Sequence, residues 1–187
     1  MATQFKQLNQ DIIDFIQKQK IYFVSSTTKD GYINLSPKGM DSLRIINNNR
    51  VIWLNSTGST NETSSNIQRD NRITIMFCSF DEQALIVKLF GKAKVIHKND
   101  KEYNELSKLL PNIPGARQIF DINLELIITV CGSAVPFFDY KGEREDLNLY
   151  WKEAGDNGLK DYWKRKNTKS LNGYETNIIK NIINNKA

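Results

Sequence analysis

The sequence is poor in the residues that build disulfide frameworks and metal clusters. It contains two cysteines and one histidine in 187 residues. Cys78 and Cys131 each lie in an apolar stretch, which favours buried free thiols over a disulfide or a metal site. His97 stands alone at the polar end of an expected strand, so histidine clusters are excluded and a serine–histidine–aspartate triad is disfavoured. We therefore predict no metal site and a surface position for His97.

Long apolar runs are also missing. No stretch could cross a bilayer, and the N-terminal residues lack the apolar core of a signal peptide, so we expect a cytoplasmic protein without membrane contact. The net charge of +5 permits an anionic ligand but does not by itself indicate nucleic acid. Basic and acidic residues alternate in the tail, and nucleic-acid binding through its basic cluster is disfavoured. That cluster comprises Lys164, Arg165, Lys166 and Lys169.

Hydrophobic periodicity and turn signals indicate one mainly β domain with flanking helices. Residues 4–20 carry apolar side chains at helical spacing, and a short helix is expected at residues 100–110. Asp30-Gly31 and Asn47–Asn49 are typical hairpin turns, and Gly91 interrupts a long strand as a bulge would. Since hairpins link most of the six or seven strands, we predict an antiparallel sheet closed into a barrel rather than a doubly wound sheet.

The predicted organisation is a single domain, 1–187. It has an N-terminal helix in 1–20, a barrel in 21–138 and a helical C-terminal extension in 139–187. Large side chains recur at helical spacing in the extension, and we interpret them as core packing or a subunit contact rather than a cofactor site. They are Leu147, Tyr150, Trp151, Leu159, Tyr162 and Trp163.

A polar run, "NSTGSTNETSSN", follows the apolar residues 51–54. Ser59 to Glu62 has the form S-x-x-E, which predicts a capping box and a helix of about two to three turns ending near Asp70. The unpaired N–H groups of a helix start suit a phosphate. Most helix starts of this kind are simply capped, so a purely structural role stays open.

The stretch "NLSPKGMDSLR" strengthens the phosphate interpretation. Pro37 and Gly39 interrupt a strand pattern where an edge, a bulge or the close approach of a ligand requires it. Lys38 between them is a good phosphate-binding residue, with an edge-strand lysine as the structural alternative. Together with the hydroxyl-rich run and the flat ring of Trp53, placed on adjacent hairpin strands, Lys38 predicts a site for a phosphate that carries an aromatic ring.

In this order and spacing, "INLSPKGMDSLRII", "VIWLNSTGSTNETSSNIQRDNRITIMFCSF" and "LIVKLFGKAKVI" resemble the pyridoxamine 5′-phosphate oxidase-like family of FMN-binding split barrels. The tail resembles one subgroup, so the similarity covers nearly the whole chain. It implies a six-stranded antiparallel split β-barrel that forms a homodimer, with FMN between the subunits. The implied cofactor-binding residues are Ser36, Pro37, Lys38, Gly39, Met40, Trp53, Leu54, Asn55, Ser59, Asn61, Glu62 and Thr63.

The resemblance also implies individual roles. Lys38 would point toward the phosphate or the ring edge, and residues 53–55 would lie under the isoalloxazine. The loop 59–63 stands where family members place a Ser-Arg-Lys phosphate clamp. Cys131 and Gly132 could face the flavin of the partner subunit, with a plain core cysteine as the alternative.

The sequence departs from the oxidase pattern at two places. Asn61-Glu62-Thr63 replaces the Arg-Lys pair, so a phosphate would rely on hydroxyls, amides and Lys38. The oxidase's arginine-containing substrate segment has no counterpart, which indicates a subgroup distinct from the true oxidase. Arg117 and Arg144 are arginines of the later chain that could serve an anionic substrate, in contexts typical of surface residues.

The functional hypothesis is an FMN-binding, flavin-dependent oxidoreductase, because FMN supplies the redox chemistry itself and requires no acid or base from the protein. Its substrate and electron donor are unassigned, and no catalytic residue is predicted. The alternative is a module that binds or carries flavin or haem without turnover.

Overall fold

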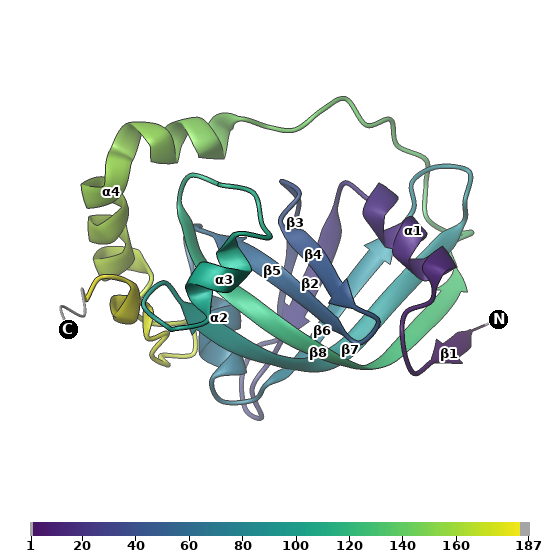
Figure 1. Cartoon of the computed structure of the whole chain (residues 1–187), viewed down its shortest axis with the longest axis horizontal. Helices are drawn as coiled ribbons and strands as arrows, with labels where there is room; N and C mark the ends of the chain where they lie inside the picture. Colours follow the sequence, from purple (N-terminus) through teal and green to yellow (C-terminus); the bar gives the residue numbers. More distant parts are fainter. Residues whose placement is uncertain (1, 184–187) are drawn as a thin grey trace.

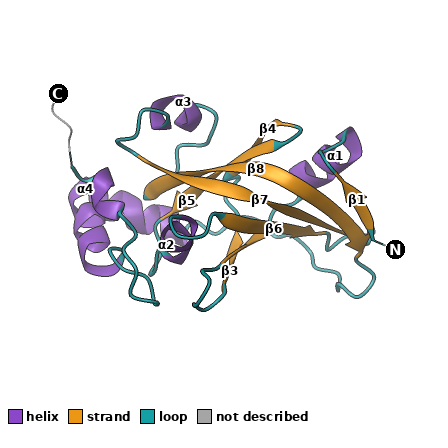
Figure 2. Ribbon diagram, turned by 90° about the horizontal axis from the view of Figure 1, so that it is seen from below, coloured by secondary structure: helices purple, strands orange, loops and turns teal. Residues whose placement is uncertain are grey.

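One curved antiparallel sheet organises the computed structural model, which describes residues 2–183 (Figures 1 and 2). The strands are β1 Thr3–Phe5, β2 Tyr22–Ser26, β3 Asn34–Lys38, β4 Leu43–Asn47, β5 Arg50–Ser56, β6 Arg72–Cys78, β7 Leu85–His97 and β8 Ala116–Cys131. Their order is β3-β2-β6-β7-β8-β5-β4, with β1 paired to β8 outside this path. No pairing joins the end strands β3 and β4 within residues 2–183, so the barrel is split there.

Helices flank this sheet, as the sequence predicts. They are α1 Gln10–Lys18, α2 Glu62–Ile67, α3 Tyr103–Ser107, α4 Asp146–Lys166 and the 3-10 helix η1 Ile178–Asn181. The fold class is therefore confirmed, although the sheet has eight strands rather than six. No helix among the described residues is long and apolar enough to span a membrane.

The N-terminal segment differs from its prediction. The helix begins at Gln10 rather than near Gln4, because Asn9 caps it by accepting a hydrogen bond from the Ile12 N–H at 2.9 Å. Residues 3–5 instead form β1, which pairs with residues 127–129 of β8. The helical spacing of apolar residues thus extends back from α1 to Phe5, although Phe5 belongs to a strand that pairs with distant β8.

The predicted turns and bulge are confirmed. β2 pairs with β3 around the Asp30-Gly31 loop, and β4 pairs with β5 around the asparagine turn. The register between β7 and β8 shifts between Phe90 and Gly91, where the bulge was expected. Local turn chemistry therefore determines most of the strand connections.

Two of the apolar clusters that make up the core lie on opposite sides of β5 and β8. Val51 and Trp53 belong to the larger cluster inside the barrel, where Trp53 stacks on Phe120 at 4.7 Å between ring centroids. Ile52 and Leu54 belong to the second cluster, under α3. Figure 2 shows α3 and α2 on opposite sides of the sheet. β5 is thus covered on both faces, which explains its uninterrupted apolar run.

The C-terminal extension crosses the molecule without regular structure before α4 begins (Figure 1). α4 bends at Gly155, whose φ of 63° a residue with a side chain rarely adopts. Trp151, Leu159 and Trp163 form a third apolar cluster with Ile178. The core-packing interpretation is confirmed for these three, whereas Tyr150 is exposed.

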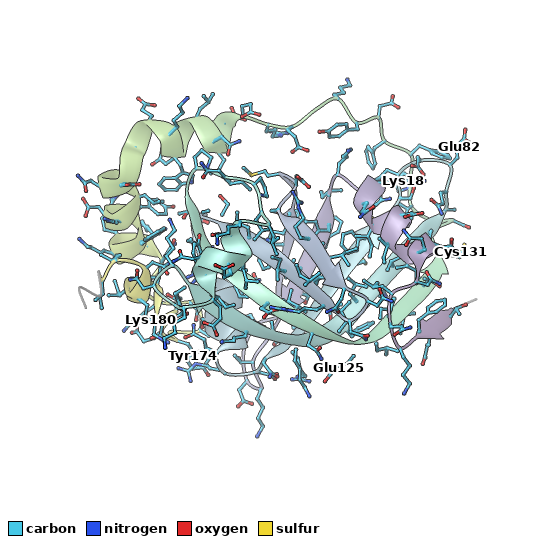
Figure 3. All side chains as sticks on the ribbon, in the orientation of Figure 1. Lys18, Glu82, Glu125, Cys131, Tyr174 and Lys180 are labelled. Carbon is cyan, nitrogen blue, oxygen red and sulfur yellow. The ribbon has the colours of Figure 1, made fainter. Side chains whose placement is uncertain are left out.

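The two thiols differ in exposure. Cys78 is buried and free, as predicted, but Cys131 is exposed because β8 ends there at the rim of the sheet. Figure 3 places Cys131 at the opposite end of the molecule from Tyr174 and Lys180. Its thiol contacts the Ser133 hydroxyl at 2.6 Å. The prediction of a buried Cys131 is therefore wrong.

The surface position predicted for His97 is also wrong. His97 is 2% exposed because η1 covers it. Its Nδ1 donates to Asn181 Oδ1 at 3.2 Å, and its Nε2 is buried with no hydrogen-bond partner between residues 2 and 183. Burial lowers the pKa of His97. The charge of Asp100 raises this pKa, and the charge of Lys180 lowers it further. The folded protein therefore favours the neutral imidazole.

The stability of the protein is expected to fall as the pH drops below about 6.5, the usual pKa of histidine. Over this window the unfolded chain takes up a proton that folded His97 excludes, so acid favours unfolding, with a slope of at most about 1.4 kcal/mol per pH unit. Thermal unfolding from pH 7.5 to 5.5 measures it. His97→Gln is expected to have a flatter profile, and an unchanged slope would contradict the assignment.

Candidate functional site

The split side of the barrel is lined by alternate residues of β3. Asn34, Ser36 and Lys38 are partly buried, whereas Leu35 and Pro37 between them are exposed. This is the two-residue alternation of a strand. Pro37 has no N–H to donate and is tolerated because β3 is an edge strand. The inward face of β3 therefore presents an amide, a hydroxyl and an ammonium group across the split.

Lys38 reaches from β3 across the split to β5, the strand next to the opposite edge strand β4. Its ammonium lies over the Trp53 ring, 5.1 Å from the centroid. β3 and β5 thus face each other, which corrects the expectation of adjacent strands. Burial lowers the pKa of Lys38 to about 8, with a smaller effect from the Arg117 charge. Among residues 2–183, no carboxylate oxygen lies within 4.0 Å of Lys38.

The predicted capping box at Ser59 and Glu62 does not form. α2 begins at Glu62, and the N-cap residue, Asn61, makes no side-chain capping bond. Glu62 Oε1 instead accepts from the Leu171 N–H at 2.8 Å, and Ser59 is exposed. The extension therefore supplies the N–H that the capping box would have taken from the local backbone. α2 is also shorter than predicted and ends at Ile67.

Asn61 is the most unusual residue of the polar segment, which we define as residues 55–66. The residue is 1% exposed, yet neither polar atom of its amide has a hydrogen-bond partner in the described part of the chain. Leaving such a group unpaired costs about 1–3 kcal/mol. Two residues later, the Thr63 hydroxyl accepts from Asn34 Nδ2 at 3.0 Å, which joins α2 to β3. Asn61 therefore carries an unused donor and acceptor at the start of a helix that contacts β3.

Other polar groups of the segment are used by the extension. The Thr57 carbonyl accepts from Trp151 Nε1 at 3.1 Å, and the Thr57 hydroxyl accepts from Trp163 Nε1 at 2.8 Å. The Ser64 hydroxyl donates to the Thr176 carbonyl at 3.0 Å. The run is therefore an ordered loop and helix beneath the extension, and many of its hydroxyls bind the protein's own chain.

Arg117 is buried, so its predicted surface position is wrong. It is 5% exposed at the start of β8. Its Nη1 donates to Asn167 Oδ1 at 2.7 Å, and the Asn55 amide, in its better-satisfied orientation, accepts from Arg117 Nε at 3.2 Å. Burial lowers the pKa of Arg117 to about 9. A charged residue in the buried run "ARQIF" was the available sequence signal.

Comparison with known proteins identifies the family. The family model described as pyridoxamine 5′-phosphate oxidase matches residues 8–131. The chain belongs to the pyridoxamine 5′-phosphate oxidase family. It is 34% identical over 144 residues to the family protein ustO of Aspergillus flavus, which covers 74% of this chain. The match spans 58% of the length of that relative.

Solved structures support the same family fold. HupZ of Group A Streptococcus, as a variant, has a TM-score of 0.53 at 21% identity, covering 65% of this chain and 98% of HupZ. A putative pyridoxamine 5′-phosphate oxidase of Lactobacillus delbrueckii also has a TM-score of 0.53, at 20% identity, covering 66% of this chain and 94% of that one. This chain therefore shares the pyridoxamine 5′-phosphate oxidase-like fold. The family model ends at residue 131, before the extension begins.

The residues predicted along β5 are buried in this family member. Trp53 lies in the core, with Phe120 against one face, while Leu54 is under α3 and Asn55 is beside Arg117. Their placement under a flavin ring stays a prediction. The same holds for Cys131 and Gly132, which lie at the far end of β8 from Arg117.

A cleft of about 890 Å³ opens beside residues 37–40. Its walls include Phe80, Phe138 and Tyr140, and Arg144 borders it. Met40 has a φ of 61°, which is uncommon for a residue other than glycine. The cleft has the size of a typical ligand site and lies next to Lys38.

Flavins are the cofactors of this family, so the polar groups around Lys38 were compared with those that an anionic group requires. Within residues 2–183, Lys38 offers a cation without a carboxylate partner, and Asn61 offers an unpaired amide N–H. Ser36 adds a hydroxyl on the same face of β3 as Lys38. These groups match the chemistry of a phosphate monoester, although the Arg-Lys clamp is absent.

Proposed function

We propose that the protein binds FMN and acts as a flavin-dependent oxidoreductase. The observation that carries the proposal is the Lys38 ammonium, which lies over Trp53 without a carboxylate partner among the described residues. A partly buried cation in this position favours an anionic ligand, because an anion restores the interactions that burial removed. The unpaired Asn61 amide and the neighbouring cleft support a ligand that joins a phosphate to a ring system.

In this proposal the protein holds and orients the cofactor. Lys38 and Ser36 would bind the phosphate from β3, and Asn61 would donate an N–H from the polar segment. Bound FMN supplies hydride and electron transfer at its ring. The aromatic walls of the cleft would exclude water from the reacting groups. Hydrogen bonds from the extension to Thr57 fix the polar segment, so the loop that carries Asn61 is held in place before the ligand arrives.

We also propose that the protein works as a homodimer. Large apolar side chains are exposed in the β2–β3 hairpin and after β8, which is typical of a surface that a partner covers. They are Tyr32, Ile33, Leu35, Phe137 and Phe138. Phe138 also lines the cleft, so a second subunit would cover the site. Sedimentation equilibrium of the purified protein tests this part.

Lys38→Gln is expected to weaken FMN binding by about 10- to 100-fold, the effect of losing one charged hydrogen bond. Riboflavin lacks the phosphate, so its affinity should change little. Fluorescence titration with both ligands measures the ratio. Lys101→Gln removes an exposed charge and is the matched control. Purified protein that is colourless and takes up no added FMN would contradict the proposal.

The alternative is a module that carries flavin without turnover. It is favoured by Asn61-Glu62-Thr63, which stands in place of the Arg-Lys pair of the family's phosphate clamp. Anaerobic addition of NADPH or NADH separates the two functions. An oxidoreductase should bleach its flavin absorbance and recover it in air, whereas a carrier should stay oxidised with both donors.

A further inference from the structure

Arg117 is a second cation whose charge the described residues leave uncompensated. Buried arginines are normally paired with carboxylates, because an isolated buried charge is costly. Among residues 2–183, no carboxylate oxygen lies within 4.0 Å of Arg117. Its side-chain partners are the neutral amides of Asn167 and Asn55. These amides orient the guanidinium but do not neutralise it.

Hydrogen bonds on several sides hold Asn167 in position beside Arg117. It is fully buried at the C-terminal end of α4, where its backbone N–H donates to the Trp163 carbonyl at 2.9 Å. Its Oδ1 faces Arg117, and its Nδ2 donates to the Gly58 carbonyl at 3.1 Å. The backbone carbonyl of Asn167 accepts from the Thr176 hydroxyl. One side chain thus connects the extension, the polar segment and the arginine.

The two cations lie around the same end of β5. Arg117 belongs to the part of β8 that pairs with residues 55–56, where the polar segment begins. Lys38 lies over Trp53, two residues earlier on β5. The charge of Arg117 is close enough to Lys38 to oppose its protonation. An anion bound near both would relieve this repulsion.

We propose that Arg117 is the second phosphate-binding cation of this protein and that Asn167 is its positioning residue. The proposal rests on the proposed function and specifies how a phosphate monoester is held. The arginine comes from β8, not from the loop where Asn61-Glu62-Thr63 replaces the family's Arg-Lys pair. The C-terminal extension is then part of the anion site, because Asn167 orients the guanidinium.

The sharpest test is Asn167→Asp. It keeps the shape of the side chain and places a carboxylate against Arg117, so an internal anion competes with the phosphate. FMN affinity is expected to fall by about 10- to 100-fold while riboflavin affinity stays unchanged. Asn104→Asp adds the same charge at an exposed position and should leave both affinities as in the wild type. Titration of the purified full chain with each ligand gives the ratio.

Arg117 variants decide the question if Asn167→Asp does not fold. Arg117→Lys keeps the charge and should retain most of the preference for FMN over riboflavin, whereas Arg117→Gln should lose it. Equal preference in these two variants would overturn the inference. The inference would also be overturned if Asn167→Asp kept the wild-type ratio of FMN affinity to riboflavin affinity while Lys38→Gln lowered that ratio. The proposed function would then stand. Wild-type protein that binds neither ligand would overturn the proposed function itself.

Discussion

Gly91→Ala is expected to destabilise the protein by about 3 kcal/mol or more, the upper range for overpacking. A Cβ at this position would lie 2.2 Å from the Asn123 carbonyl oxygen and 3.2 Å from the Leu124 Cα. Both atoms belong to the backbone of β8, so a rotamer change cannot relieve the clash. The bulge between Phe90 and Gly91 brings the two strands this close.

Thermal unfolding measures this effect. A loss of about 3 kcal/mol corresponds to roughly 6–12 °C in a protein of this size. Gly58→Ala is the matched control, because a Cβ there would meet no atom within 4 Å. Its stability should stay within about 0.5 kcal/mol of the wild type. Equal melting temperatures for the two variants would show that β8 moves away at no cost.

The strand connections could be predicted because their signals are local. The Asn47 side chain closes a turn by accepting a hydrogen bond from the Asn49 N–H, and Gly91 marks a bulge because the β8 backbone leaves no room for a side chain there. β1 could not be predicted in this way. Residues 3–5 pair with residues 127–129, and nothing near residue 3 indicates that distant partner. Long-range pairing of a three-residue strand leaves too short a pattern to separate it from the helix that follows.

In the candidate site, too, local signals could be read from the sequence and distant contacts could not. Lys38 and the polar segment could be singled out from neighbouring residues, and the structure places Lys38 at the split. The capping box failed because Leu171 provides the N–H that Glu62 accepts from. Arg117 and His97 were assigned to the surface because the extension that buries them is remote in sequence. Their environment depends on tertiary contacts that periodicity does not contain.

Trp163→Ala is expected to cost about 3–5 kcal/mol, as for other buried large aromatic residues. Trp163 is 1% exposed, packs in the cluster of the extension and donates its indole N–H to Thr57. Trp163→Phe keeps an aromatic ring in the cluster and loses this hydrogen bond and part of the buried volume, so it should cost less than the change to Ala. Thermal unfolding ranks the two variants. Leu149→Ala, at an exposed position of the same helix, should change stability by less than about 0.5 kcal/mol.

The same substitution links the fold to the site. Trp163 packs against the polar segment one turn before Asn167, so losing its ring should loosen the amide that orients Arg117. FMN affinity should then fall more than riboflavin affinity, and proteolysis of the extension should become faster than in the wild type. Excess FMN should restore part of the lost stability, by about 2.7 kcal/mol at one hundred times its dissociation constant. If Trp163→Ala keeps the wild-type preference for FMN although the extension is cleaved, the extension covers the barrel without building the anion site.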